Sequence, residues 1–431
     1  MKELFWISLG HASAMLGSLS VVKVMTHFLD PAVYGEVALA MTGALFVQNI
    51  ILGPCCNSLS RYYVLAKEQN KIKTYFLASQ KLFTEAVIAS LVMALIIIFG
   101  SLIAGFYKYI LQILIAAMLA IISGSSSAFD TIQTARRERK IVAWHQGVQQ
   151  WTRVLCVVVA ILLFGKTSIT VLLGACFGAF IPLISQAIFL KNSVENSLLQ
   201  NDVISVKELN KQVSQMKKFC FPFLIWGIFG WLQSSSDKWA LGASNSTSDV
   251  GRYAVLMQLS LAPTTIFAGV IAQFISPIIY EKAGSGLDLY KLKNAANINK
   301  NIFKIIMILT ILITIVLYLN HRKIFSVLTD SKYSEVSYLM PWVFLSGGVF
   351  SGAQILSMSL LLHFKSQTLL WPKVGTAILA IILYFGVAPR FGLNGLVVAS
   401  LFVASIYTVW IYLLSEKNLS GTIRLILSQK T

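Results

Sequence analysis

Two glutamines and an arginine share one face of a long apolar stretch that we expect to form a helix. Gln146, Gln150 and Arg153 are four and three residues apart, a spacing that stacks helical side chains above one another. A guanidinium is permanently charged, and its fork of donors matches phosphate oxygens. Arg153, with Gln150 beside it, is therefore a candidate ligand for a phosphate-bearing molecule. A structural ion pair between Arg153 and Asp130 is the competing interpretation.

Two more cations stand at the ends of predicted helices. Arg61 closes one of them and is either a helper in phosphate binding or only an anchor that sets orientation in a membrane. Lys23 either meets an anionic group in an outward-opening cavity or extends to the membrane interface. It ends a stripe of small residues that is typical of helix packing. The stripe consists of Gly10, Ser13, Gly17 and Ser20.

An aspartate and a lysine stand beside two tryptophans at the end of another predicted helix. Charged side chains within apolar spans are costly and are by default hypotheses of function. Asp237 and Lys238 are therefore candidate substrate-binding residues, because the faces of Trp231 and Trp239 can stack on sugars. The alternative is that these tryptophans form an aromatic belt at the membrane interface.

Other polar and small residues have structural interpretations. Lys81 and Glu85 are four residues apart on one predicted helix and are expected to pair with each other. Glycines four residues apart indicate close helix packing, namely Gly174 with Gly178 and Gly348 with Gly352. Prolines inside helices free backbone groups and are candidate bending points, namely Pro54, Pro182, Pro263 and Pro341.

The elements that carry these residues are long apolar helices. Hydrophobic residues make up 56% of the 431 positions, charged residues 12%, and the mean hydropathy is +0.74. A soluble domain has roughly 25% charged residues, so lipid must solvate much of this chain. A spanning helix needs roughly 20 apolar residues, and no stretch alternates as barrel strands do. We predict an all-α polytopic membrane protein with twelve spans, near residues 4–29, 36–60, 76–104, 109–131, 147–164, 168–190, 219–241, 250–277, 301–320, 336–362, 371–388 and 393–415.

Lysine and arginine predict the orientation. The segments on the side of the N-terminus contain about 24 of them, and the opposite side about 9. Basic residues accumulate in cytoplasmic loops, so both termini are expected on the cytoplasmic side of the membrane. The net charge of +18 therefore reports topology, and no nucleic-acid partner is expected. The triplet Ala12–Ala14 faintly resembles a signal-peptidase site, but we expect an uncleaved first helix.

The sequence lacks the motifs that are typical of several function classes. The phosphate loop GxxxxGK[ST] and the zinc motif HExxH are both missing from the sequence, so neither ATP hydrolysis nor a metal is expected. The five cysteines lack CxxC spacing, which gives no support to a disulfide framework. We expect no cofactor and no enzymatic activity.

The segments after the first and seventh predicted spans, Leu29–Met41 and Thr247–Met257, share a weak internal repeat. An ungapped offset of about 216 residues superimposes Gly35 on Gly251, and it also matches Ala38 with Ala254, Met41 with Met257 and Ser60 with Ser276. Such an offset places one six-helix half on another. We therefore divide the chain into an N-terminal half (1–190), a cytoplasmic linker (191–218), a C-terminal half (219–415) and a cytoplasmic tail (416–431). Parallel halves place a substrate path between them and operate by alternating access.

Four short motifs resemble one known family. They are DPxxYGxxAL at Asp30–Leu39, SRYY at Ser60–Tyr63, DKWALG…DVGRYAV at Asp237–Val255 and RFGLNGLVVAS at Arg390–Ser400. The chain is similar to the bacterial polysaccharide biosynthesis proteins, the O-antigen and capsule repeat-unit flippases of the multidrug/oligosaccharidyl-lipid/polysaccharide flippase superfamily. The loop between the second and third spans lacks the GxxxDRxxR pattern of major facilitator proteins.

The resemblance implies a V-shaped bundle that flips undecaprenyl-pyrophosphate-linked oligosaccharide across the membrane. Arg153, with Lys23 or Arg61, would then capture the lipid pyrophosphate. Expected partners are this lipid-linked oligosaccharide, membrane lipids, and polysaccharide polymerase and chain-length regulator proteins. A multidrug exporter on the same fold is the alternative, and a membrane polymerase or ligase is a further one, although the predicted external loops are short.

Overall fold

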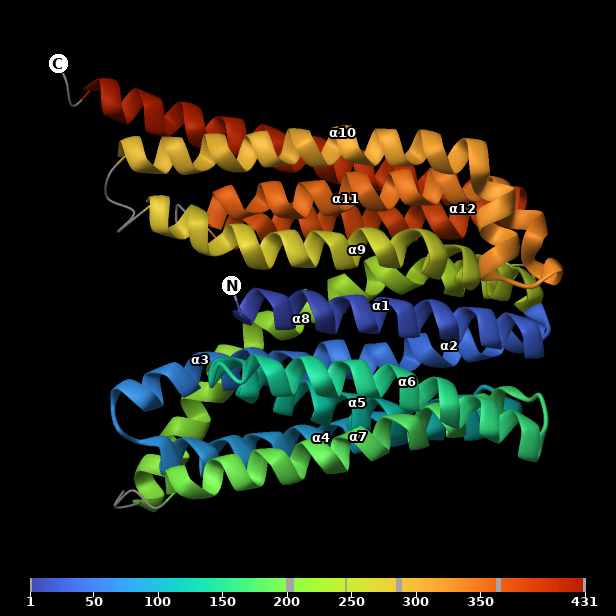
Figure 1. Cartoon of the computed structure of the whole chain (residues 1–431), viewed down its shortest axis with the longest axis horizontal. Helices are drawn as coiled ribbons and strands as arrows, with labels where there is room; N and C mark the ends of the chain where they lie inside the picture. The colour runs from blue at the N-terminus through green and yellow to red at the C-terminus, as the bar shows by residue number, and fades with distance from the viewer. Residues whose placement is uncertain (1, 199–204, 245, 284–288, 362–365, 429–431) are drawn as a thin grey trace. The chain divides into compact units, whose positions relative to one another are not determined.

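The computed structural model describes residues 2–198, 205–244, 246–283, 289–361 and 366–428 (Figure 1). Helices account for nearly all of these residues, and none of them forms a strand. The predicted all-α class is therefore confirmed. Contacts divide the chain into two compact units, of which unit 1 contains residues 1–29 and 36–231, and unit 2 contains residues 30–35 and 232–431.

The helices follow one another with short connections. The first helices are α1 (Lys2–Phe28), the continuous set α2 (Pro31–Val47), η1 (Gln48–Leu52) and α3 (Gly53–Glu68), then α4 (Ile72–Ile103), η2 (Tyr107–Tyr109), α5 (Ile110–Ala135), α6 (Arg139–Phe164), α7 (Ser168–Leu198) and α8 (Val206–Ser244). They lie in unit 1, except that the start of α2 and the end of α8 belong to unit 2. Those of unit 2 are α9 (Thr247–Ala283), α10 (Leu289–Leu328), η3 (Ser331–Leu339), α11 (Met340–Leu361), η4 (Ser366–Leu369) and α12 (Leu370–Ser428).

These helices lie on the predicted spans. Among the residues that the structure describes, nine helical segments are long and apolar enough to cross a membrane. The last of them, α12, carries two predicted spans and is broken at Gly392, whose φ is 53°. A tight turn at Gly165 separates α6 from α7, with φ of 92°, a conformation open to glycine because it lacks a Cβ. The total of twelve spans remains a prediction.

The segments predicted as long cytoplasmic loops are largely helical. α7 continues to Leu198 and α8 already begins at Val206, so helix occupies much of the linker 191–218. The reason is that charged and polar helix formers extend a helix beyond the membrane when neighbouring helices supply partners. Lys71 pairs with Glu208, and Lys217 Nζ lies 2.6 Å from Glu85 Oε2.

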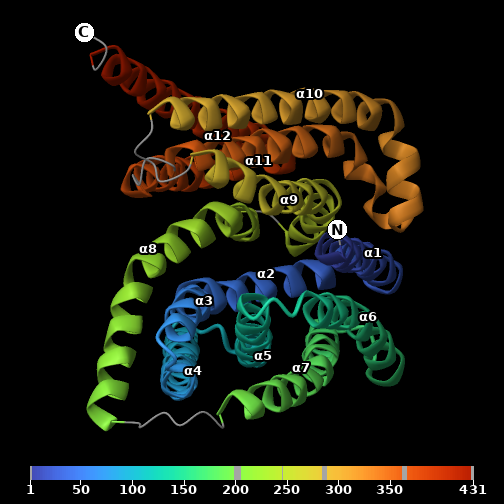
Figure 2. The same ribbon diagram turned by 60° about the vertical axis from the view of Figure 1, so that its left-hand side comes forward.

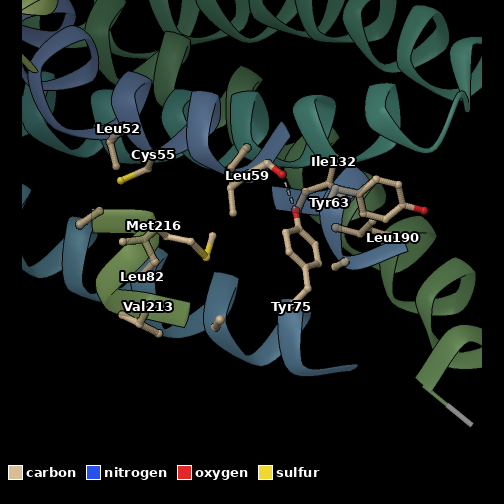
Figure 3. Packing of buried hydrophobic residues seen from close by; sticks show 14 of the residues in the cluster. Leu52, Cys55, Leu59, Tyr63, Tyr75, Leu82, Ile132, Leu190, Val213 and Met216 are labelled. Carbon is tan, nitrogen blue, oxygen red and sulfur yellow. Dashed lines mark hydrogen bonds between the residues drawn. The ribbon is translucent and has the colours of Figure 1, made fainter. Parts of the chain in front are cut away.

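Aromatic and aliphatic side chains of α3, α4, α5, α7 and α8 form the main core of unit 1 (Figure 3). Tyr75 is fully buried, and its hydroxyl donates a hydrogen bond of 2.9 Å to the Leu59 carbonyl oxygen. Met216 and Val213 bring the first half of α8 into this core. Burial of such side chains contributes roughly 1.5–3 kcal/mol each in water, but in lipid close packing provides most of the association energy.

The small-residue stripe of the first helix packs against α6, as predicted. A Cβ built on Gly10 would lie 3.0 Å from Ala143, and one on Gly17 would lie 2.7 Å from the Gln150 Cβ. On the other helix, a Cβ on Gly147 would lie 3.0 Å from the Ser13 Oγ. Small residues on both helices therefore let the two backbones approach closely.

In unit 2, α9, α10 and α12 pack around α11, and α10 to α12 lie side by side in Figures 1 and 2. The predicted glycine pair of α11 faces α10, where Cβ atoms on Gly348 and Gly352 would come within 2.2 Å of Thr310 and 2.3 Å of Met307. Asn299 is fully buried and donates to the carbonyl oxygens of Ile355 and Leu356 at 3.0 and 3.1 Å. Glycine contacts and an interhelical hydrogen bond therefore hold α10 to α11.

The same pattern of helix packing occurs within each of the two units. In unit 1, α3 and α4 both pack on α5, which in turn packs on α7. In unit 2, α9 and α10 both pack on α11, which packs on α12. A shift of six predicted spans converts the first pattern into the second. This is the relation that the weak sequence repeat predicts.

The beginnings of α2 and α9 cross within unit 2 at the two aligned glycines. A Cβ built on Gly35 would lie 1.9 Å from the Thr247 carbonyl oxygen, and one built on Gly251 would lie 1.9 Å from the Pro31 carbonyl oxygen. Each glycine therefore faces the carbonyl group of the residue that stands four positions before the other glycine. Two backbones can approach this closely only where neither residue has a side chain.

We predict that Gly35→Ala lowers the thermal unfolding temperature of the purified protein. The added methyl group overlaps a backbone carbonyl, so the crossing helices must separate, at a cost of about 1–3 kcal/mol or more. Gly43→Ala is the matched control on the same helix, because nothing lies within 4 Å of its Cβ position. Equal unfolding temperatures for the two variants would contradict the role of this crossing.

Candidate functional site

Arg153 lies in the middle of α6, where α7 approaches most closely. A Cβ on Gly178 of α7 would lie 2.5 Å from the Arg153 Cα, and the Thr152 hydroxyl donates to the Gly178 carbonyl oxygen at 2.8 Å. Gly174 fits against Val157 in the same way, so the predicted packing role of the pair Gly174 and Gly178 is confirmed. The backbone of Arg153 is thus fixed by packing.

The guanidinium of Arg153 has no protein partner within the described ranges. Its Nε is buried and makes no hydrogen bond, and no carboxylate pairs with it there. The competing interpretation, an ion pair with Asp130, is wrong. Asp130 instead accepts hydrogen bonds from Gln186 Nε2 at 2.5 Å and Gln146 Nε2 at 3.3 Å. Two amides therefore satisfy the aspartate and leave the arginine available to an anion.

The two glutamines on the predicted face of α6 have different surroundings. Gln146 donates a hydrogen bond to Asp130 of α5. Gln150, half-buried, places its Cβ against Gly17 of α1. Of the two, Gln150 keeps its role as a candidate ligand beside Arg153, and that role remains a prediction.

The other candidate cations are exposed. Lys23 lies near the end of α1 with an exposed side chain, and Arg61 is exposed on α3. Neither pairs with Arg153, which has no partner in the described part of the chain. Exposed positions suit both an interface anchor and a cation that meets a mobile ligand, so both interpretations of these residues stay predictions.

Asp237 and Lys238 form a buried polar cluster on α8 in unit 2. Asp237 is only 3% exposed, and its side chain accepts a hydrogen bond of 3.0 Å from the Tyr253 hydroxyl. It also accepts from the Lys238 backbone nitrogen at 2.7 Å, and the Lys238 Nζ lies 3.5 Å away. Sequence reasoning missed Tyr253, although its position in the DVGRYAV motif could have indicated it. This arrangement satisfies the charges internally, as buried charges require.

The two tryptophans beside this cluster differ. Trp231, in unit 1, donates from Nε1 to the Thr42 carbonyl oxygen at 2.7 Å and stacks edge-on against Phe46. It is therefore a packing residue. Trp239 is 43% exposed and keeps an accessible face.

The predicted pair of Lys81 with Glu85 is wrong. Lys81 Nζ donates to Asn210 Oδ1 at 3.0 Å, while Glu85 pairs with Lys217, and both partners lie on α8. The physical reason is that α8 continues as a helix along α4, so an interhelical partner replaces the intrahelical one. Sequence spacing alone does not reveal such a neighbour.

The motif that carries the resemblance at Asp30–Leu39 has a structural role in unit 2. Lys332 Nζ lies 2.9 Å from Asp30 Oδ1, and the Tyr34 ring packs edge-on against Tyr333. The Tyr34 hydroxyl donates to Gln258 Oε1 at 3.3 Å. The conspicuous residues of this motif thus position the start of α2.

Nine helical segments of the described residues, each long and apolar enough to cross a membrane, define a multi-pass membrane protein. Within the described residues, no three histidine, cysteine or acidic side chains gather in a way that could hold a metal. The chain belongs to the polysaccharide biosynthesis protein family, whose model matches residues 1–283. The predicted family is therefore confirmed. No curated protein matches the sequence.

The fold is similar to those of solved membrane transporters. The lipid II flippase MurJ in its inward closed conformation has a TM-score of 0.68 at 12% identity, with 97% of this chain and 89% of that chain covered. The Vibrio cholerae MATE transporter VcmN in its bent form has a TM-score of 0.62 at 14% identity, with coverage of 98% and 97%. An inward-facing multidrug resistance MATE family transporter of the MOP superfamily has a TM-score of 0.57 at 12% identity, with coverage of 98% and 96%. These likenesses establish the fold.

We predict that Asp237→Ala destabilises the protein by about 3 kcal/mol, because Lys238 and Tyr253 lose their buried partner. The double variant Asp237→Leu with Lys238→Met removes both charges and should recover most of the loss. Thermal unfolding in detergent measures both effects. If the two variants lose the same stability, the cluster is not a structural charge pair.

Proposed function

We propose that this protein flips undecaprenyl-pyrophosphate-linked oligosaccharide repeat units across the bacterial cytoplasmic membrane for O-antigen or capsule synthesis. The family and the fold support a membrane transporter of polysaccharide precursors. The observation that carries the choice of substrate is Arg153, a cation in a membrane-spanning helix whose Nε is buried with no partner among the described residues. A pyrophosphate is a dianionic ligand that such a fork of donors recognises.

The mechanism requires a cationic binding group and movement of two halves. Arg153 captures the pyrophosphate, with Gln150 beside it and Lys23 or Arg61 assisting, while the polyprenyl tail stays in lipid. Lys238 and the exposed face of Trp239 contact the glycan, and the buried Asp237 holds the Lys238 side chain in place for it. Alternating access of two duplicated halves then exposes the glycan outside. The reciprocal contact between Gly35 and Gly251 supports the duplication.

Two features in α2, η1 and α3 support a bending point. The π-helical turn η1 comes directly before Pro54, which was predicted as such a point. A Cβ on Gly227 of α8 would lie 2.1 Å from the Asn49 carbonyl oxygen in this turn. π-turns are weak places in helices and are frequent at functional sites.

The orientation and the partners follow from the charge distribution and the substrate. Both termini are cytoplasmic because the basic segments face that side. The partners are the lipid-linked substrate, membrane lipids, and the polysaccharide polymerase and chain-length regulator that act on the flipped product. Transport needs no nucleophile, no metal and no cofactor from this chain.

A multidrug exporter is the second candidate, because the MATE transporters share the fold. A cavity for cationic drugs favours free carboxylates. Asp130 and Asp237 are instead satisfied by amides, a tyrosine and a lysine. This observation favours an anionic substrate.

We predict that Arg153→Ala abolishes surface polysaccharide while the amount of protein in the membrane stays unchanged. The side chain makes no protein contact that the packing of α6 on α7 needs, because that contact involves the backbone. Arg322→Ala, an exposed arginine on α10, is the matched control and should produce normal polysaccharide. Immunoblots of polysaccharide and of the tagged protein measure both. Normal polymer from the Arg153 variant would refute this assignment.

A further inference from the structure

A cavity of about 510 Å³ lies within unit 1 between α4, α5 and α7. Its volume is in the range of roughly 300–1,000 Å³ that holds small organic ligands. Most of its lining is apolar. The apolar side chains of the wall are Leu59, Phe76, Leu77, Phe83, Phe129, Ile132, Leu190 and Val194.

This cavity lies beside the core of unit 1 and does not involve Arg153. Leu59, Ile132 and Leu190 belong to both the core and the cavity wall (Figure 3). Tyr75 fixes the position of Leu59 through its hydrogen bond. The wall is therefore part of a packed scaffold and is present before any ligand binds.

Two lysines line this cavity. Lys73 lies in the first turn of α4 and is half-buried, and Lys191 lies on the last turns of α7 and is exposed. Neither has a carboxylate or hydrogen-bond partner within the described ranges. The neighbouring lysines differ, since Lys71 pairs with Glu208 and Lys217 with Glu85. The two cations at the cavity are thus left for an anion from outside the chain.

An apolar cavity with two cations fits an amphiphile with a hydrocarbon chain and a negatively charged head. Lys73 and Lys191 both belong to segments of the side predicted to be cytoplasmic. The cytoplasmic leaflet contains anionic lipids, and basic pockets between helices on this side bind their head groups. A polyprenyl chain is several times longer than an acyl chain and exceeds this volume, so an acyl chain is the better fit.

We propose that this cavity binds an anionic phospholipid of the cytoplasmic leaflet. One acyl chain lies along Phe83 and Phe129, and the phosphate lies between Lys73 and Lys191. The bound lipid connects α4 to α7 and stabilises unit 1. The proposal is independent of the transported substrate, because it uses neither Arg153 nor any residue of the Asp237 cluster.

The test is lipid binding to the purified full-length protein. Native mass spectrometry follows a titration with phosphatidylglycerol and, in parallel, with phosphatidylcholine of the same acyl chains. We expect saturable binding of one phosphatidylglycerol and a higher unfolding temperature in its presence. Equal binding of the two lipids would overturn the proposal.

Two kinds of variant localise the site. Each lysine near an anionic lipid contributes about a factor of five in affinity, so Lys73→Gln with Lys191→Gln should weaken phosphatidylglycerol binding roughly thirtyfold. The matched control Lys67→Gln with Lys207→Gln removes two exposed lysines of the same side that do not line the cavity. A similar loss in the control would show general surface attraction and contradict the site.

The second variant replaces Ala187, a small residue of the cavity wall on α7, by Phe. Ala187→Phe fills the cavity and keeps both lysines. It should abolish the phosphatidylglycerol-dependent rise in unfolding temperature, while the unfolding temperature in phosphatidylcholine stays near that of the parent protein. Retained phosphatidylglycerol affinity in Ala187→Phe would place the lipid elsewhere. Undecaprenyl phosphate serves as a competitor. If it displaces phosphatidylglycerol from the cavity, the proposal that a phospholipid occupies the cavity is wrong.

Discussion

The contact between the starts of α2 and α9 constrains the rest of unit 2. Two helix backbones cross where Gly35 and Gly251 each face a carbonyl oxygen of the other segment at 1.9 Å from the ideal Cβ position. No side chain fits there, so both positions must be glycine. Around this crossing, Asp30, Tyr34 and their partners Lys332 and Tyr333 fix the direction of α2. The motif at Asp30–Leu39, one of the four on which the family resemblance is based, thus forms this helix crossing.

The second constraint is the cost of polar groups in lipid. Asp130, Asp237 and Asn299 each have donors or acceptors supplied by neighbouring helices. Arg153 differs from these residues, since its Nε is buried and has no partner in the described residues, a feature that it shares with the Nε atoms of Arg139 and Arg252. Asp130 and Asp237 have partners within the protein and Arg153 has none in the described part of the chain, and this contrast favours an anionic ligand at Arg153. The packing of Gly178 against the backbone of Arg153 then serves to position that side chain.

The sequence alone predicted the helical class, the positions of the spans and the packing role of the small-residue stripes, because these depend on local patterns. Hydropathy locates α4 and α7, and the spacing of Gly10 and Gly17 locates the face that meets α6. Charge pairing was not predictable, because the partners of Lys81 and Glu85 lie on α8, more than 100 positions away. For the same reason the sequence allowed an ion pair between Asp130 and Arg153. Only the fold shows that two glutamines donate hydrogen bonds to Asp130 instead.

The central claim is that this chain moves a pyrophosphate-linked glycolipid across a bilayer. Purified protein in proteoliposomes that contain undecaprenyl-pyrophosphate-linked oligosaccharide measures this directly, with a glycan-specific probe added outside. Protein-containing vesicles should expose nearly all of the glycolipid over time, whereas empty vesicles should expose only the outer-leaflet half. Equal exposure in both kinds of vesicle, especially with efflux of a cationic dye from the protein-containing ones, would contradict the account.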